Sequence, residues 1–288
     1  MVIRALALGW IVYFWVFLIT SQSGFLEVDA EAYWGLTLDG LYQGVHLGDQ
    51  DAFLYSPIVA YLFLPFSALP YDVFYAILAA VNLAALVWLL GPELGALSLF
   101  LLPVSNEVAR GNIHLLLGAA IVIGFRYSGS WAWVFLTKVT PGIGVLWFAP
   151  RREWRKLGTA LGVTAALVAV SFVLTPELWL RWFDLLTGSV TITRPSFLEI
   201  PVLPRLAVAA GLVVVAGWRG WPMIVPVAAT LALPAIWVNS LAMLVAVVPL
   251  WRNPPPGTRT RPARAAAPDR AVGEVPPDAD NGLRGTGP

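Results

Sequence analysis

The sequence predicts an all-α, polytopic transmembrane protein, and three observations carry this prediction. Hydrophobic residues make up 58% of the 288 residues and charged residues only 12%, whereas about a quarter of the residues are charged in a soluble domain. Apolar runs recur from one end of the chain to the other, and helices can satisfy their own backbone groups inside a bilayer. The 14 Trp and 8 Tyr residues suit the two interfacial belts of such a protein.

About ten spans are expected, because a span needs about 20 apolar residues and fewer where it stops short of the interface. No clear small-x-small cleavage pattern follows the first apolar run, so this run is interpreted as a retained helix. The expected spans cover residues 5–22, 53–69, 72–90, 94–108, 112–126, 131–149, 157–175, 201–218, 222–236 and 238–251.

The apolar pattern is interrupted between residues 92 and 126, where Glu107, Arg110, Asn112 and His114 lie close together in the sequence. Two interpretations are open: a tight helical hairpin with a cytoplasmic turn, or a broken helix that re-enters the bundle and lines a cavity. A charge near the bilayer centre usually pairs with another group or faces a wet cavity.

Basic residues predict the orientation of the bundle, because cytoplasmic loops collect Lys and Arg. The densest basic cluster is Arg151, Arg152, Arg155 and Lys156, which is therefore expected to be cytoplasmic. Counting spans from this cluster places both termini inside as well. It places residues 23–52, 127–130 and 176–200 outside, and this count favours the hairpin at 92–126.

The composition changes after Arg252, where Pro, Ala, Gly, Arg and Asp replace the large apolar residues. The chain is therefore expected to consist of one membrane domain, residues 1–252, and a disordered cytoplasmic tail, residues 253–288. A net charge of +1 gives no indication of nucleic-acid binding. The expected partners at this stage are membrane lipids.

An acidic segment follows the first apolar run, with six carboxylates and no Lys or Arg between Glu27 and Asp51. Asp29 is a candidate general base, provided that it comes within hydrogen-bond reach of a hydroxyl. Asp29 and Tyr33 share a face if the segment is helical, and Glu31 lies between them. The alternative is that these carboxylates only keep the loop solvated. They could bind a divalent ion, although they show no recognisable ligand spacing.

Several further residues are candidates for a binding site. Tyr55, at the start of the second expected span, is either a neighbour of the acidic segment or an ordinary interfacial tyrosine. Lys138 lies too deep in its expected span to reach the cytoplasmic face, so it should meet a carboxylate, a carbonyl or a lipid phosphate. The outer segment 176–200 is typical of an amphipathic interfacial helix, and its Arg181 and Arg194 could bind a phosphate with their planar guanidinium groups.

Several of these stretches occur in an order that resembles a known family. They are DAEAYW (29–34), FLYSPIVAYLFLPFSALP (53–70), ARGNIHLLL (109–117), TKVTPGIGVLWFAPRREWR (137–155) and LPAIWVNSL (233–241). Together they resemble the polyprenol-phosphate-dependent glycosyltransferases of family 87, which belong to the GT-C fold class and include α-mannosyltransferases and arabinofuranosyltransferases. The family patterns are written D-x-x-x-Y-Y, F-x-Y-P-P, G-Q/N-x-N, K-x-x-P and S-P-x-S-W. The chain has Ser56 in place of the first proline and His114 in place of the second asparagine.

The resemblance implies an inverting transfer of one sugar, mannose in particular, from a polyprenyl-phosphate donor to a lipid-linked or polysaccharide acceptor. The reaction would take place on the outer face of the bacterial inner membrane, with Asp29 as the catalytic base. The departing phosphate needs cationic stabilisation, for which Lys138, Arg181 and Arg194 are the candidates. The other expected substrate-binding residues are Glu31, Tyr33, Tyr55, Asn112 and His114. No cofactor is implied with certainty besides the donor lipid, and a divalent metal is left open.

Two other functions are compatible with the sequence. A transporter or lipid-linked sugar flippase could use Lys138 and the break at 106–114 as a substrate path, although no internal repeat is visible. A non-catalytic membrane partner of another envelope enzyme is the third hypothesis.

Overall fold

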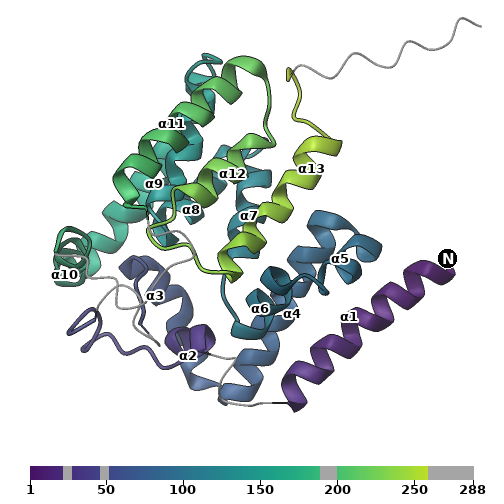
Figure 1. Cartoon of the computed structure of the whole chain (residues 1–288). Coiled ribbons are helices and arrows are strands. Elements are labelled where there is room, and N and C mark those ends of the chain that lie inside the picture. Colours follow the sequence, from purple (N-terminus) through teal and green to yellow (C-terminus); the bar gives the residue numbers. More distant parts are fainter. Residues whose placement is uncertain (22–27, 46–51, 189–199, 259–288) are drawn as a thin grey trace, which may run out of the picture.

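The computed structural model describes residues 1–21, 28–45, 52–188 and 200–258, and Figure 1 shows a helical molecule throughout this part of the chain. The described residues contain no β-strand, so the all-α prediction is confirmed for them. The α-helices are α1 (Val2–Thr20), α2 (Val28–Trp34), α3 (Pro57–Phe63), α4 (Tyr71–Leu90), α5 (Pro92–Ser98), α6 (Leu102–Arg110), α7 (His114–Gly124), α8 (Trp131–Thr137), α9 (Trp154–Leu174), α10 (Pro176–Thr187), α11 (Val202–Arg219), α12 (Ile224–Leu231) and α13 (Val247–Arg252). Four 3-10 helices join them: η1 (Leu64–Ala68), η2 (Ser128–Ser130), η3 (Thr140–Phe148) and η4 (Asn239–Ala246).

Four described helices are long and apolar enough to cross a membrane: α1, α4, α9 and α11. The helices α6 and α7 pass the same test only as a pair, with a bend of 105° between them. The other expected spans coincide with shorter helical segments, so ten crossings stay a prediction. The tail beyond residue 258 lies outside the described residues.

The segment 131–149, expected as one span, folds back on itself. Its two halves, α8 and η3, meet at Lys138, where the backbone becomes extended. Gly144 of η3 packs against the ring of Trp131 at the start of α8, so closely that an added Cβ would lie 2.4 Å from the ring. The ring centres of Phe125, which precedes α8, and Trp147, near the end of η3, are also only 5.3 Å apart. The two ends of this segment are therefore close together, and Lys138 lies at the tip between them.

A second folded-back segment follows α11. The guanidinium of Arg205, near the start of α11, donates hydrogen bonds to the carbonyls of Leu231, Leu233 and Pro234 at distances of 2.7–2.9 Å. The chain then turns and returns as η4 and α13. The residues after α13 approach the basic cluster, because Arg151 Nη2 donates to Gly257 O at 2.9 Å. Asn239 consequently lies at the turn between α12 and η4.

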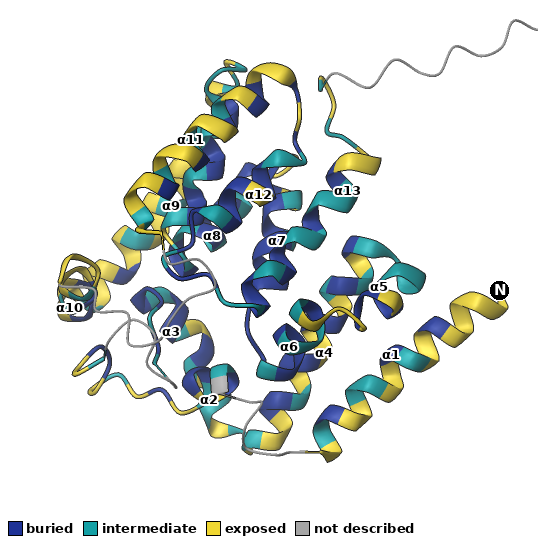
Figure 2. Cartoon of the chain, viewed as in Figure 1, coloured by how far each residue is buried: buried dark blue, intermediate teal, exposed yellow. Residues whose placement is uncertain are grey.

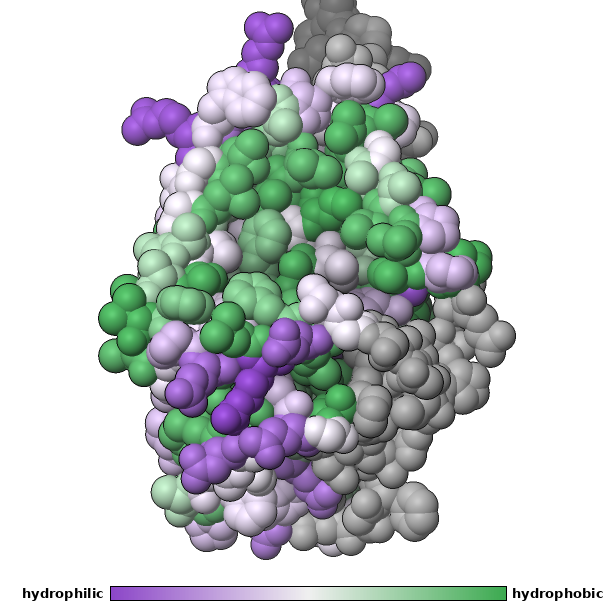
Figure 3. Space-filling model, turned by 90° about the vertical axis from the view of Figure 1, so that its left-hand side faces the viewer, coloured by the Kyte–Doolittle hydropathy of each residue, from purple (hydrophilic) through white to green (hydrophobic). Residues whose placement is uncertain are grey.

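The burial pattern distinguishes an interior from an apolar outer surface. Figure 2 shows buried residues concentrated on α7, α8 and α12, whereas much of α1, α9 and α11 is exposed. These exposed positions include large hydrophobic residues such as Val12, Leu167 and Leu212. Figure 3 shows a broad hydrophobic area on one face. Hydrophilic groups lie above this area, and others lie below it. Exposed apolar surface of this extent is typical of contact with lipid.

Candidate functional site

The break between α6 and α7 lies inside the molecule and is covered by α2. Gly111 ends α6 in the left-handed conformation, with φ of 66°, which favours glycine. An added Cβ at Gly111 would lie 2.7 Å from Cβ of Ala30 in α2. The break is a sharp bend with buried polar groups on both sides. This geometry fits the broken-helix interpretation, and the number of times that α6 and α7 cross the membrane stays a prediction.

Glu107 is the centre of a buried hydrogen-bond network at this break. Its carboxylate accepts a short hydrogen bond from the backbone N–H of His114, which satisfies one of the free donors at the start of α7. The other carboxylate oxygen lies 2.9 Å from Nδ1 of His114 and 3.1 Å from Nδ2 of Asn239. Glu107 and His114 are fully buried and Asn239 is nearly so. The network therefore joins α6, α7 and η4.

Lys138 reaches the same network from the tip between α8 and η3. Its Nζ lies 3.0 Å from Nε2 of His114 and 5.8 Å from the ring centre of Tyr55. The sequence predicted that this amino group would meet a carboxylate, a carbonyl or a phosphate, and in the structure it meets an imidazole nitrogen. The charges of Glu107 and Asp29 both lie close enough to interact electrostatically with Lys138.

Asp29 forms an ion pair across the break. Its Oδ2 accepts a hydrogen bond from Nε of Arg110 at 2.8 Å, and each side chain is about a quarter exposed. Asp29 lies in α2, as the helical interpretation of this segment predicted. The pair connects the acidic segment with α6 and places a partly accessible carboxylate beside the buried network.

Two tyrosines complete this side of the site. The hydroxyl groups of Tyr33 and Tyr55 are 2.8 Å apart, and Tyr42 donates a hydrogen bond to the carbonyl of Tyr55 at 2.5 Å. Burial, together with the neighbouring Tyr55 and Asp29, raises the pKa of Tyr33 well above its ordinary value. The Tyr33 hydroxyl is therefore neutral and remains a hydrogen-bond donor.

Asn112 holds the backbone of the break itself. Its side-chain oxygen accepts a hydrogen bond from the N–H of Ile113 at 2.7 Å, and its carbonyl accepts one from Nδ2 of Asn82 in α4 at 2.9 Å. Buried backbone groups that leave a helix need such partners. Asn112 thus contributes to the site through the shape of the chain.

The structure brings together most of the predicted site residues. Those that meet around the break are Asp29, Tyr33, Tyr55, Asn112, His114 and Lys138. Glu31 is exposed on α2. Arg181 of α10 donates to the carbonyl of Asp39 at 3.3 Å and makes no described contact with the network. Arg194 lies outside the described residues.

Glu107, Arg110, Asn239 and Arg205 were not among the predicted site residues. Glu107 and Arg110 stood within the interruption at 92–126, and the rarity of intramembrane charges could have identified both. The same signal applies to Arg205, a single charge inside an expected span. No sequence signal distinguishes Asn239 from an ordinary polar residue at a turn.

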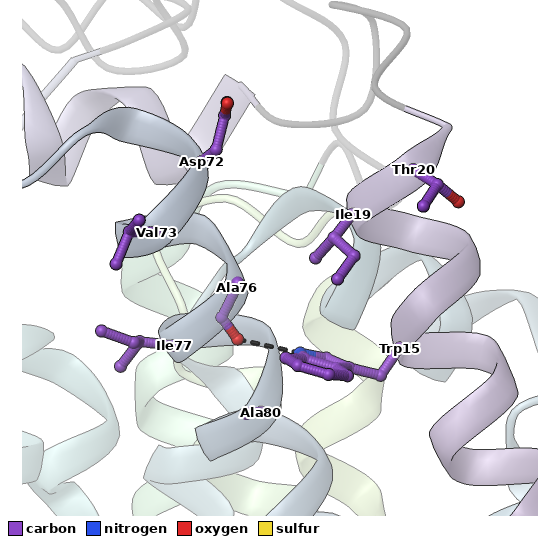
Figure 4. Close-up of a pocket in the computed structure, with 8 residues that line it drawn as sticks. All are labelled: Trp15, Ile19, Thr20, Asp72, Val73, Ala76, Ile77 and Ala80. Atoms are coloured by element: carbon purple, nitrogen blue, oxygen red, sulfur yellow. Dashed lines mark hydrogen bonds between the residues drawn. The ribbon is translucent and has the colours of Figure 1, made fainter.

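No three His, Asp or Glu side chains of the described part gather into a group that could hold a metal ion. A shallow pocket between α1 and α4 is lined mostly by apolar side chains, with Thr20 and Asp72 at one end (Figure 4). Trp15 crosses it and donates a hydrogen bond to Ala76 O at 2.9 Å. None of the residues around the break lines this pocket.

Comparison with known proteins gives one match. The model of glycosyltransferase family 87 matches residues 53–267, which include the break, Lys138 and Asn239. The matched part begins after α2, so Asp29 and Tyr33 precede it. No curated protein and no solved structure matches the chain.

Proposed function

The chain belongs to glycosyltransferase family 87, and we propose that it transfers one sugar, mannose, from a polyprenyl-phosphate donor to a hydroxyl group of a lipid-linked or polysaccharide acceptor. The proposed reaction inverts the anomeric configuration. It takes place at the outer face of the bacterial inner membrane, in a GT-C-like bundle with both termini in the cytoplasm. Family membership favours this function over the transporter and flippase hypotheses.

One structural observation carries the proposal. The partly exposed carboxylate of Asp29 is paired with Arg110 and lies beside the buried network of Glu107, His114 and Lys138. A base for the acceptor and a cation for the donor phosphate are thus available at one place. Both are needed for transfer from a lipid phosphate.

Asp29 accepts the proton of the acceptor hydroxyl, whose oxygen forms a bond to the anomeric carbon of the donor. The bond between this carbon and the phosphate oxygen breaks, and the electron pair leaves with the polyprenyl phosphate. Lys138 stabilises the negative charge on the departing phosphate, and Arg181 and Arg194 are further candidates for that role. The leaving group is a phosphate, so it needs no proton from the protein.

The proposal is tested by transfer with purified protein in lipid nanodiscs. Polyprenyl-phosphate-[14C]mannose and GDP-[14C]mannose are each supplied with a membrane glycolipid fraction as acceptor, and labelled product is extracted and quantified. We expect product from the lipid donor and none from the nucleotide donor. Product from the nucleotide donor alone would contradict the proposed donor class, and retained anomeric configuration in the product would contradict inversion.

A further inference from the structure

His114 has two different neighbours, and they determine which of its ring nitrogens carries hydrogen. An ammonium group has only donors, so Nε2 of His114, 3.0 Å from Nζ of Lys138, must accept a hydrogen bond. A carboxylate has only acceptors, so Nδ1, 2.9 Å from Glu107 Oε2, must donate one. With Lys138 as an ammonium and Glu107 as a carboxylate, the two contacts are compatible with a single state of the ring, the neutral tautomer with hydrogen on Nδ1.

Three hydrogen-bond donors surround the side chain of Glu107: the N–H of His114, the ring Nδ1 of His114 and the amide of Asn239. All of these groups are buried, and a buried charge is tolerated where it is paired and hydrogen-bonded. Glu107 also fixes the start of α7 in space, because it binds a free backbone donor of the first turn. It therefore constrains both the position and the tautomer of His114.

Lys138 depends on this constraint. Its amino group stands at the end of a flexible four-carbon chain and at the tip between two short helices. Nε2 of His114 is the hydrogen-bond partner that the described residues offer it. The described residues give the other two N–H groups of the ammonium no hydrogen-bond acceptor.

We propose that Glu107 is a positioning residue, which fixes the Nδ1–H tautomer of His114 and so holds Lys138 in place to bind the phosphate of the donor. Glu107 itself touches no substrate. The phosphate-binding step rests on the function proposed above, whereas the link from Glu107 through His114 to Lys138 does not.

The substitution Glu107→Gln tests this link, because it changes the hydrogen-bonding pattern of the side chain but neither its size nor its shape. A carboxamide has one acceptor oxygen, and the backbone N–H of His114, which cannot move its hydrogen, keeps that oxygen in the Oε1 position. The NH2 group then faces Nδ1–H of His114 and the side-chain amide of Asn239. The ring relieves this conflict by moving its hydrogen to Nε2, where it would face the ammonium of Lys138. Lys138 then loses its acceptor.

The tautomer can be measured directly, because the chain contains only two histidines. In a His46→Asn background, His114 is the single imidazole, and its two 15N resonances in selectively labelled protein in nanodiscs report which nitrogen is protonated. We expect the Nδ1–H tautomer with Glu107 and the Nε2–H tautomer with Glu107→Gln. An Nε2–H or doubly protonated ring with Glu107 present, or no change in Glu107→Gln, would overturn the proposal.

The same proteins are then titrated with a short-chain polyprenyl phosphate. Loss of an oriented charged partner weakens binding by about tenfold or more, and we expect this for Glu107→Gln. Glu153→Gln, the same change at a carboxylate paired with Arg151 and Lys156, is the matched control and should alter neither readout. Equal affinity in Glu107→Gln and Glu153→Gln would overturn the role of Glu107. No binding by the unsubstituted protein would instead contradict the proposed donor.

Discussion

Asp29 and Arg110 are 81 residues apart in the sequence, yet Oδ2 of Asp29 lies 2.8 Å from Nε of Arg110. Because Asp29 is in α2 and Arg110 is the last residue of α6, this ion pair fixes the acidic segment against the break in the bundle. Both side chains are about a quarter exposed, so the pair remains accessible to a ligand. Asp29 is thereby oriented at the edge of the buried Glu107 network.

The first prediction concerns Arg110. Replacing it by Gln removes the charged partner that orients Asp29, and a hydrogen bond to a charged group contributes about 1.5–3 kcal/mol. We therefore expect kcat/KM for sugar transfer to fall about tenfold or more, with partial recovery in Arg110→Lys. Arg126→Gln, at an exposed arginine stacked on Tyr127, is the control. Equal kcat/KM in Arg110→Gln and Arg126→Gln would contradict a role for the ion pair.

The second prediction concerns Gly111. An alanine there would have to adopt φ near 66° and would collide with Ala30, the residue after Asp29. The left-handed conformation alone costs about 1–2 kcal/mol, and the collision displaces α2. We expect Gly111→Ala to lower both the apparent melting temperature and the transfer rate. Gly158→Ala is the control, because the site is open and helical, and alanine there should stabilise slightly. Similar behaviour of the two variants would refute this account of the break.

The positions of the helices could largely be predicted from the sequence, because hydropathy alone identifies apolar segments. Each expected span contains one helix, as at α4, α9 and α11, or parts of two helices. The path of the short segments could not be predicted. Whether residues 131–149 cross or fold back depends on contacts such as that of Gly144 with Trp131, which hydropathy does not encode.

The sequence indicated which residues form the candidate site better than it indicated which residues they contact. A deep lysine and a carboxylate after the first helix stood out by charge, and Lys138 and Asp29 do lie at the site. Their partners, His114 and Arg110, are distant in sequence, and a single sequence contains no record of such pairs. Arg181 was singled out by its place in an amphipathic segment, and its described contact is with the carbonyl of Asp39.

The third prediction concerns Arg205, which donates four hydrogen bonds to backbone carbonyls. Lysine cannot reproduce this fork, and each buried group left without a partner costs about 1–3 kcal/mol. We expect Arg205→Lys to lower the apparent melting temperature markedly and to weaken transfer, because the turn that carries Asn239 loosens. Arg219→Lys, an exposed position on the same helix, should be close to unchanged. The melting temperatures of the two purified variants in detergent test this expectation. A loss in Arg205→Lys that is no larger than the loss in Arg219→Lys would contradict it.

The central claim is that Asp29 is the base of a sugar transfer, and one assay tests it directly. Membranes with matched amounts of the unsubstituted protein, Asp29→Asn and Asp39→Asn are supplied with labelled polyprenyl-phosphate-mannose. A general base contributes about 10²–10⁴-fold to the rate, so transfer should fall by that factor in Asp29→Asn and persist in Asp39→Asn, whose side chain is exposed. Equal transfer by all three proteins would contradict the claim and remove Asp29 from the mechanism.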